Sequence, residues 1–254
     1  MIELERDGEV HVLKMRGGEN RVNPDFLAAM NAALDSVESS EGAAALVTTG
    51  AGKFFSNGLD LDWMAGEGRE RAGEVLAGLN GLFARLLTFP MATVAALNGH
   101  AFAGGGMIAL AHDYRVMRRD RGFFCLPEID LGMGVPLAAG MYAVIEARLP
   151  GPLVHEMLIT GRRYGGEEAL AKGIVDAAVP EADVVAQAVE LVRPLAGKDR
   201  ETMGAIKRGL SPIDLGECER LLDFEIEKQV ECFLSTDGIE GVKAFLQKRP
   251  PKFE

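Results

Sequence analysis

Apolar residues in this chain recur either in short continuous runs or at helical spacing. The runs over 44–49 and 91–97 have strand length and no polar alternation, which predicts two strands buried on both faces of a parallel sheet. Between residues 26 and 37 the apolar positions have helical spacing. Asn23-Pro24-Asp25, just before them, supplies a cap, a first-turn proline and a first-turn acid. These signals predict an amphipathic helix that ends near Gly42.

The remaining elements follow the same two patterns. Short strands are predicted over 9–15, 114–117, 123–126 and 174–179. Helices are predicted over 69–88, 104–111, 137–148, 152–159, 166–172, 181–195, 199–208, 216–234 and 237–247. Strands therefore alternate with helices until about residue 180, and helices alone complete the chain. This order is typical of an α/β core with a helical C-terminal extension.

Length and composition indicate a large folded core. The chain has 254 residues, of which 48% are hydrophobic, and a chain of this kind buries well over half of its extended surface. Lys and Arg number 27 against 38 Asp and Glu, which gives a net charge of −11. Because nucleic acids and anionic membranes are bound by basic surfaces, we expect neither as a partner.

One uncharged stretch, from Leu86 to Ala111, is long enough to span a bilayer. It contains Pro90, the turn dipeptide Asn98-Gly99 and three consecutive glycines. These residues instead predict a buried strand, a turn and a buried helix. We therefore expect no membrane-spanning segment.

The cysteines and the chain ends favour a cytoplasmic protein. Cys125, Cys218 and Cys232 are odd in number and widely spaced, so they predict neither a disulfide framework nor a zinc site. Residues 1–20 lack the apolar run of a signal peptide, and residues 252–254 do not match a peroxisomal address. We expect a reducing, cytoplasmic environment and no bound metal.

Two glycine-bearing turns follow the two buried strands. They read FFSNGLDL at 54–61 and NGHAFAGGGM at 98–107. Ligands of α/β proteins bind beyond the carboxyl ends of strands, and the second turn leads into a helix whose first N–H groups are free. One N–H group from each turn would form an oxyanion hole. The alternative is that the glycines serve only close helix packing, and spacing alone does not decide between the two. The phosphate-loop pattern GxxxxGK[ST] and the serine-hydrolase pattern GxSxG are both absent.

Glu128 lies between apolar residues in CLPEIDLG at 125–132. Burial would raise the pKa of such a carboxyl, which suits a general base near neutral pH. Taken alone, the pattern favours the alternative, an exposed loop acid or a helix cap.

Three motifs in order, FFSNGLDL, NGHAFAGGGMIALAHDYRVM at 98–117 and LPEIDLGM at 126–133, resemble the enoyl-CoA hydratase/isomerase (crotonase) superfamily. LITGRRYGGEEALAKGIVDAAV at 158–179 extends the similarity. The resemblance implies an α/β fold, a crotonase-like spiral of β-β-α units with a C-terminal helical region. It divides the chain into a spiral, acyl-CoA-binding core over 1–195 and a helical trimerisation region over 196–254. It also implies a homo-trimer or a hexamer, built as a dimer of trimers.

The resemblance also implies where the substrate binds. The substrate is an acyl-CoA thioester, so coenzyme A is part of the substrate and no separate cofactor is expected. The N–H groups of Leu59 and Gly104 would hold the oxygen of an enolate. Substrate or coenzyme A binding is assigned to Arg21, Val22, Gly58, Asp60, Leu61, Asp62, Met107, Phe245 and Lys248, the last two near the adenine or its phosphates. For Asp60, a cap of the following helix is an equal alternative.

The acids decide which reaction we expect. Hydratases of this family use two glutamates, because water must be deprotonated and a proton delivered to the double bond. The first position, after the glycine run, holds Met107, and the second, after Pro127, holds Glu128. A thioether transfers no proton. The resemblance therefore favours a delta-3,delta-2-enoyl-CoA isomerase of fatty-acid β-oxidation, in which Glu128 alone moves a proton from C2 to C4.

Two alternatives stay open at this point. The first is an enoyl-CoA hydratase or another CoA-thioester lyase of the same fold, using Glu128 alone or with a second acid such as Asp130. The second is a non-catalytic acyl-CoA-binding subunit, which a lost oxyanion geometry would favour.

Overall fold

Two β-sheets organise the chain in the computed structural model, which describes residues 2–131, 137–210, 226–247 and 249–252. The larger sheet contains, in spatial order, β1 (Ile2–Asp7), β2 (Val10–Met15), β3 (Ala45–Gly50), β5 (Thr93–Leu97), β7 (Tyr114–Arg118) and β9 (Ala177–Val179). The smaller sheet contains β4 (Phe54–Ser56), β6 (His100–Phe102) and β8 (Phe124–Cys125). Neighbouring strands are parallel except β1 and β2, which form an antiparallel hairpin.

Helices fill the connections between strands and most of the C-terminal part. The α-helices are α1 (Pro24–Glu38), α2 (Leu61–Ala65), α3 (Ala72–Leu87), α4 (Gly104–Ala111), α5 (Ala139–Arg148), α6 (Gly151–Thr160), α7 (Gly166–Ala171), α8 (Val184–Val192), α9 (Arg200–Leu210) and α11 (Thr236–Leu246). Residues 226–234 are also helical. The 3₁₀ turns are η1 (Arg69–Arg71), η2 (Glu128–Leu131), η3 (Glu181–Asp183) and η4 (Arg193–Leu195).

Three consecutive units build both sheets at once. Each unit places its first strand in the large sheet and its second in the small sheet: β3 then β4, β5 then β6, β7 then β8. Helical segments then follow, with α2 and α3 after the first unit, α4 after the second, and η2 and α5 after the third. This repeated β-β-α order is the one that the resemblance implied.

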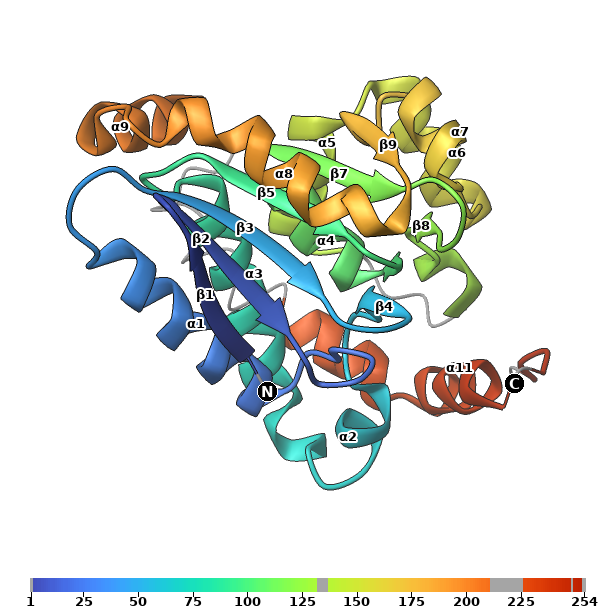
Figure 1. Cartoon of the computed structure of the whole chain (residues 1–254). Coiled ribbons are helices and arrows are strands. Elements are labelled where there is room, and N and C mark those ends of the chain that lie inside the picture. The colour runs from blue at the N-terminus through green and yellow to red at the C-terminus, as the bar shows by residue number, and fades with distance from the viewer. Residues whose placement is uncertain (1, 132–136, 211–225, 248, 253–254) are drawn as a thin grey trace.

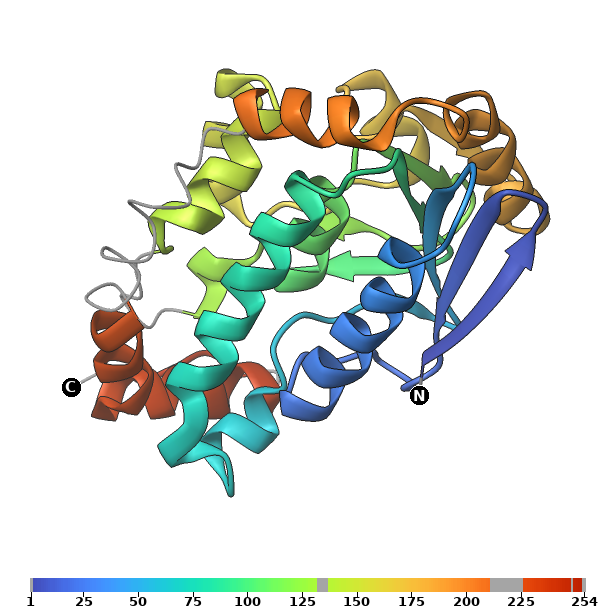
Figure 2. The same ribbon diagram turned by 90° about the vertical axis from the view of Figure 1, so that its left-hand side faces the viewer.

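The large sheet is covered on both faces (Figures 1 and 2). Side chains alternate along a strand, so Val47 and Val94 point toward α8 while Leu46 and Ala95 point toward the other core. α8 contributes an apolar stripe to the first core, and α1, α3 and α4 contribute to the second. Burial on both faces explains why the runs that form β3 and β5 are continuously apolar.

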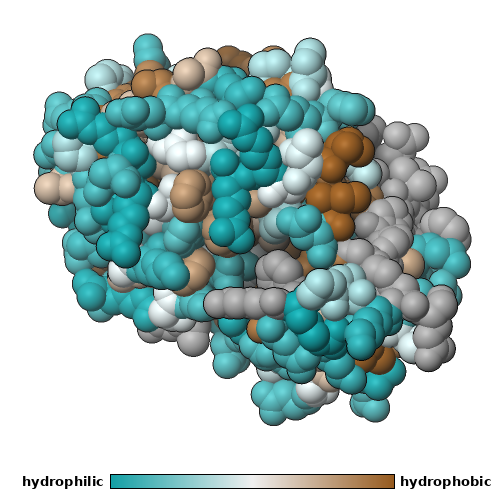
Figure 3. Space-filling view, turned by 90° about the vertical axis from the view of Figure 1, so that its right-hand side faces the viewer, coloured by the Kyte–Doolittle hydropathy of each residue, from teal (hydrophilic) through white to brown (hydrophobic). Residues whose placement is uncertain are grey.

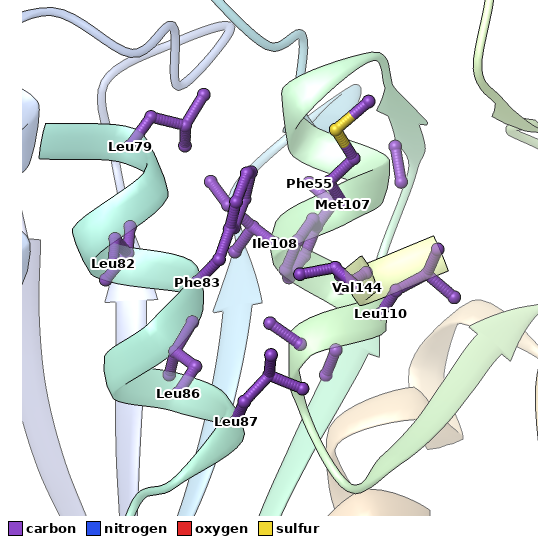
Figure 4. Packing of buried hydrophobic residues seen from close by; sticks show 14 of the residues in the cluster. Phe55, Leu79, Leu82, Phe83, Leu86, Leu87, Met107, Ile108, Leu110 and Val144 are labelled. Carbon is purple, nitrogen blue, oxygen red and sulfur yellow. The ribbon is translucent and has the colours of Figure 1, made fainter. Parts of the chain in front are cut away.

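α3 and α4 pack against each other in the second core. Figure 4 shows side chains of α3, including Leu79 and Phe83, reaching toward Met107 and Ile108 of α4. All four are at most 1% exposed. Every residue of α4 is buried, so this helix is fixed in position by its surroundings on all sides.

The structure corrects the sequence prediction at several short segments. β1 was not predicted, because it is an exposed edge strand whose charged residues hide the strand pattern. β4 and β6 were predicted only as turns, since three residues are too few to show a period. The first helix ends at Glu38 rather than near Gly42. The predicted helix over 216–234 is described only from residue 226.

The chain after residue 195 is tied to the core by polar contacts. Arg200 donates to the carbonyl oxygens of Ser40 (2.6 Å) and Gly42 (2.7 Å), and Lys207 Nζ donates to Asp113 Oδ2 (2.5 Å). The domain boundary at 195 and the trimerisation role of the following region stay predictions. Among the described residues, no helix combines the length and apolar character needed to cross a membrane.

Replacement of Phe83 tests the packing between α3 and α4. Phe83→Ala should lower the free energy of unfolding by about 3–5 kcal/mol, because it removes a fully buried ring and leaves a cavity. Urea denaturation followed by circular dichroism measures the change. The control is Ile159→Ala, at a side chain that is 60% exposed, and it should change the value by at most about 0.5 kcal/mol. An equal loss of free energy of unfolding in both variants would contradict the packing of Phe83 between α3 and α4.

Candidate active site

The candidate site forms where the three strands of the small sheet end. Because β4, β6 and β8 are parallel neighbours, their carboxyl ends meet at one edge. Leu59 follows the end of β4, Gly104 follows the end of β6, and Glu128 follows the end of β8, each within three residues. The small sheet therefore brings together the three residues on which the predicted chemistry depends.

The loop that contains Leu59 is hydrogen-bonded to the segment that precedes α1. Val22 N–H donates to the Gly58 oxygen (2.8 Å), and Asp60 N–H donates to the Val22 oxygen (3.0 Å). This parallel bridge leaves the Leu59 N–H without an acceptor among the described residues. Gly58 has φ +77°, a conformation that glycine adopts without a steric cost.

The Gly104 N–H is presented by a strained turn. Ala103 has φ 50° and ψ −127°, an unusual conformation for a residue with a side chain. The Ala103 N–H donates to the Cys125 oxygen (3.0 Å), which fixes the turn to β8. α4 begins at Gly104 and has no side-chain cap, so the Gly104 N–H faces outward at the positive end of the helix dipole.

The two loops touch directly. A Cβ atom built on Gly58 would lie 3.0 Å from the Phe102 oxygen and 3.1 Å from the Gly104 nitrogen. A Cβ atom on Gly105 would lie 2.3 Å from the Ser56 oxygen. Side chains at these positions would push the loops apart. Glycine here serves the close approach of two unpaired N–H groups, an arrangement that can stabilise a negative oxygen.

Glu128 is a carboxyl with one side in the protein interior. Its Oε2 atom is fully buried and has no hydrogen-bond partner in the part of the chain that the structure describes. Burial raises the pKa of Glu128 from its ordinary 4.5 to about 7, against a weaker opposing effect of a hydrogen bond from its own backbone. The group therefore exchanges a proton near neutral pH. Glu128 is therefore not the freely exposed loop acid that the pattern alone had favoured, and its role as a general base stays a prediction.

The structure places no second carboxylate at the predicted first-acid position. Met107 is 1% exposed and packs in the core formed with α3 (Figure 4). Asp130 is exposed, and its Oδ2 lies 2.8 Å from where a Cβ of Gly161 would be. Met107 is therefore a buried core residue, and Asp130 is directed toward the loop after α6.

The expected coenzyme A residues between 21 and 62 lie together, although several are occupied by contacts within the chain. Arg21 Nε donates to Glu19 Oε2 (2.8 Å), and its Nη1 pairs with Asp62 and lies 3.6 Å from Asp60 Oδ1. Asp60 also caps α2 by accepting from the Trp63 N–H (3.3 Å), which supports the cap alternative. Leu61 is the first residue of α2. A pocket of about 260 Å³ opens here, lined by Gly17, Glu19, Asn20, Arg21, Asn23, Phe26 and Asp60.

The roles assigned to Phe245 and Lys248 stay predictions. Phe245 belongs to α11, and Lys248 lies outside the described residues. α11 contacts α2 and η2 and projects from the main body in Figure 1. The face on which it lies is mostly hydrophilic, with a compact hydrophobic patch and a few smaller hydrophobic spots (Figure 3).

Sequence reasoning missed the residues that hold the two loops in place. Asn20, with φ 49° and 2% exposure, donates from Nδ2 to the Phe55 oxygen (2.9 Å), and its own carbonyl accepts from Ser56 Oγ (2.8 Å). The signal was available, since asparagine is one of the few residues that favour this backbone conformation. Ala103 gave no such signal.

Comparison with known proteins agrees with this geometry. A family model described as enoyl-CoA hydratase/isomerase matches residues 5–254. Enoyl-CoA delta isomerase 3 of Arabidopsis thaliana is 40% identical over 222 residues, which cover 84% of this chain and 92% of that protein. Carnitinyl-CoA dehydratase of Escherichia coli (strain K12) is 37% identical over 210 residues, which cover 81% of this chain and 79% of that protein.

A solved structure extends the match to three dimensions. The crystal structure of a probable enoyl-CoA hydratase from Mycobacterium tuberculosis H37Rv superposes with a TM-score of 0.76 at 28% identity. The match covers 97% of this chain and 96% of that one. On sequence and fold together, this chain belongs to the enoyl-CoA hydratase/isomerase family, has the crotonase fold and stands close to the delta isomerase branch.

Proposed function

We propose that this protein is a delta-3,delta-2-enoyl-CoA isomerase that moves the double bond of a 3-enoyl-CoA to the 2-trans position. The observation that carries the proposal is that the described part of the site has one buried carboxyl that exchanges a proton, Glu128, and no second one. At the position where a hydratase of this family needs its other acid, this chain has the buried thioether of Met107. The 40% identity to a delta isomerase supports the same reaction.

The reaction begins with removal of a C2 proton. The thioester oxygen lies between the N–H groups of Leu59 and Gly104, and the Glu128 carboxylate takes the proton. The electron pair of the C2–H bond then spreads over C2 to C4 and the thioester oxygen, as a dienolate. Two N–H donors and the helix dipole stabilise this charge as it develops.

The reaction ends with return of the same proton at C4. Protonated Glu128 donates to C4, the double bond settles between C2 and C3, and the thioester carbonyl re-forms. No water and no further acid enter this sequence. A carboxyl whose pKa is about 7 suits both halves, because neither of its protonation states is strongly favoured at neutral pH.

A second candidate is dehydration of a 3-hydroxyacyl-CoA, or hydration in reverse. The 37% identity to carnitinyl-CoA dehydratase favours it. In that reaction Glu128 would take the C2 proton and deliver it to the departing C3 hydroxyl. The homo-trimer or hexamer, the acyl-chain length and a place in β-oxidation stay predictions of the resemblance.

A two-substrate assay separates these reactions. With purified protein, 3-hexenoyl-CoA should convert to 2-trans-hexenoyl-CoA, and 2-trans-hexenoyl-CoA should gain no water, as followed by enoyl absorbance and product mass. Glu128→Gln should lower kcat by about 10²- to 10⁴-fold, since the proton carrier is lost. Glu67→Gln, at an exposed acid beyond α2, is the control and should keep the wild-type rate.

Three results would contradict the isomerase. Isomerisation by Glu128→Gln at the wild-type rate would remove Glu128 from the mechanism. Hydration of 2-trans-hexenoyl-CoA at an equal or higher rate would favour the dehydratase. Intact binding of both esters with no reaction would favour an acyl-CoA-binding subunit.

The pKa of Glu128 also predicts how stability varies with pH. The folded protein keeps this proton up to about pH 7, whereas the unfolded chain loses it near pH 4.5. The contribution to folding is therefore fully present below pH 4.5 and is lost as pH rises through 7. The glutamine of Glu128→Gln has no such proton to lose. The free energy of unfolding of this variant minus that of the wild type should therefore be larger at pH 8 than at pH 4.5, by up to about 3 kcal/mol.

Urea unfolding at pH 4.5 and pH 8 measures this difference. The control is Ile159→Ala, whose stability relative to the wild type should be the same at both pH values because no titrating group is changed. A Glu128→Gln effect of equal size at both pH values would mean that the Glu128 carboxyl is not desolvated in the folded protein.

Replacement of Met107 tests the missing second acid. Met107→Glu places a carboxyl where the surroundings are fully buried, so its pKa should rise and it should be able to deliver a proton. We expect weak hydration of 2-trans-hexenoyl-CoA, detected by product mass. Met107→Gln, which has similar size and no carboxyl, should show none. A folded Met107→Glu protein that isomerises but never hydrates would place residue 107 out of reach of the double bond.

A further inference from the structure

Asn20 joins the segment between β2 and α1 to the end of β4. The residue is 2% exposed. Its Nδ2 donates to the Phe55 oxygen (2.9 Å), its carbonyl oxygen accepts from Ser56 Oγ (2.8 Å), and its Oδ1 accepts from the Gly17 N–H (2.8 Å). Two of these three hydrogen bonds cross to residues that lie 35 and 36 positions later in the chain. Asn20 therefore ties two segments together where neither has a regular strand pairing.

The two residues that Asn20 contacts are themselves packed against the rest of the site. Phe55 is fully buried and belongs to the core that contains α3 and α4 (Figure 4). A Cβ atom built on Gly105, in the first turn of α4, would lie 2.3 Å from the Ser56 oxygen. The end of β4 is thus in direct contact with the turn that presents the Gly104 N–H. Asn20 anchors its own segment to this unit.

Further hydrogen bonds connect this anchor with the peptide group of Leu59. The Gly58 N–H donates to Ser56 Oγ (3.3 Å), and the Gly58 oxygen accepts from the Val22 N–H (2.8 Å). The Gly58 oxygen and the Leu59 N–H belong to one trans peptide group, in which C=O and N–H point in opposite directions. A bond that holds the Gly58 oxygen toward Val22 therefore directs the Leu59 N–H away from Val22. The direction of this N–H depends on where Val22 lies.

The backbone of Asn20 turns the chain between these contacts. Its φ of 49° is uncommon for a residue with a side chain, although asparagine adopts it more readily than most. Glycine would permit the same turn. Only an amide, however, supplies both the donor for the Phe55 oxygen and the acceptor for the Gly17 N–H. Both the side chain and the backbone preference of asparagine are therefore used here.

We propose that Asn20 is a positioning residue, which fixes Val22 and thereby the direction of the Leu59 N–H. The inference rests on the proposed function, in which the thioester oxygen lies between the N–H groups of Leu59 and Gly104. Asn20 itself touches no substrate. Because negative charge develops on that oxygen, a misdirected donor weakens the transition state more than the bound ester. The signature of this role is a fall in kcat at nearly constant KM.

Two neutral substitutions break different bonds in this arrangement. Asn20→Gly keeps the left-handed backbone and removes the side-chain bonds, and Ser56→Ala removes the hydroxyl between Asn20 and Gly58. Each should lower kcat for 3-hexenoyl-CoA by about 10- to 100-fold, which is less than the usual effect of deleting an oxyanion donor outright. Each should change KM by less than about threefold.

The matched control is Thr49→Val, in the large sheet. Thr49 is 2% exposed, and its Oγ1 donates to the Ala96 oxygen (2.8 Å), so this substitution also removes a buried hydrogen bond from a hydroxyl to a backbone oxygen. It should lower the unfolding temperature and keep the wild-type kcat.

Ester binding gives a second measurement that requires no turnover. Acetoacetyl-CoA ionises to an enolate with its own ultraviolet absorption, whereas butanoyl-CoA keeps a neutral thioester. Titration with both esters at pH 7 should show that the wild type binds acetoacetyl-CoA as the enolate. Asn20→Gly and Ser56→Ala should weaken enolate binding by about tenfold or more and butanoyl-CoA binding by less than about twofold. Thr49→Val should keep the wild-type ratio of the two dissociation constants.

The outcomes separate this role from the isomerase and from folding. An unchanged kcat in both variants would overturn the inference, as would an equal loss of affinity for both esters, since Asn20 would then serve the fold alone. If the wild type binds the enolate and converts no 3-hexenoyl-CoA, the isomerase is wrong, and the ratio of dissociation constants in the variants still decides the role of Asn20. If the wild type binds no enolate, the oxyanion hole and this inference are both wrong.

Discussion

The contact between Gly58 and the turn at Ala103-Gly104 is the constraint on which the rest of the site depends. Two N–H groups can face one oxygen only if the loops that carry them approach to backbone contact, and a Cβ on Gly58 would already lie 3.1 Å from the Gly104 nitrogen. The small sheet brings the two loops this close, because its parallel strands end side by side. Its strands are two or three residues long, too short to be stable alone, and they are held by the large sheet on one side and α4 on the other.

This construction explains why the strain sits at Ala103. Its backbone conformation is costly for a residue with a Cβ atom. The cost is offset because α4 is buried on every side and the Ala103 N–H is bonded to β8. The turn is therefore set before any ligand arrives. Donors that are already oriented lose little free energy to reorganisation when charge develops on the oxygen.

Much of this fold could be read from the sequence, and the reasons for the failures are physical. β3 and β5 are buried on both faces, and α1 has a cap, a proline and a regular apolar stripe, so their patterns are strong. β4 and β6 lack enough residues for any period, so the small sheet was visible only as two turns. β4 and β6 nevertheless end at the two predicted glycine-bearing turns. These turns carry the residues that the resemblance assigns to the oxyanion hole.

Some site residues could likewise be placed from the sequence, and others only from the structure. Leu59, Gly104 and Glu128 stand in motifs whose spacing sets their position at strand ends, so sequence could place them together. Asn20 and Ser56 act through contacts between segments far apart in the chain, which no local pattern records. Arg21 shows the converse limit. The resemblance assigned it to coenzyme A binding, but three carboxylates of its own chain surround it, and only the folded structure reveals them.

Those carboxylates raise the question of how an acidic chain would hold the anionic ester that we propose as its substrate. A net charge of −11 is spread over the whole surface, and salt screens exposed charges beyond about 8 Å at physiological ionic strength. The proposed thioester site lies at the start of a buried helix, where N–H dipoles face a medium that screens them less. Local dipoles can therefore favour negative charge on one oxygen although the protein as a whole is negative. Arg21, already paired with three carboxylates of its own chain, adds little net positive charge to this local field.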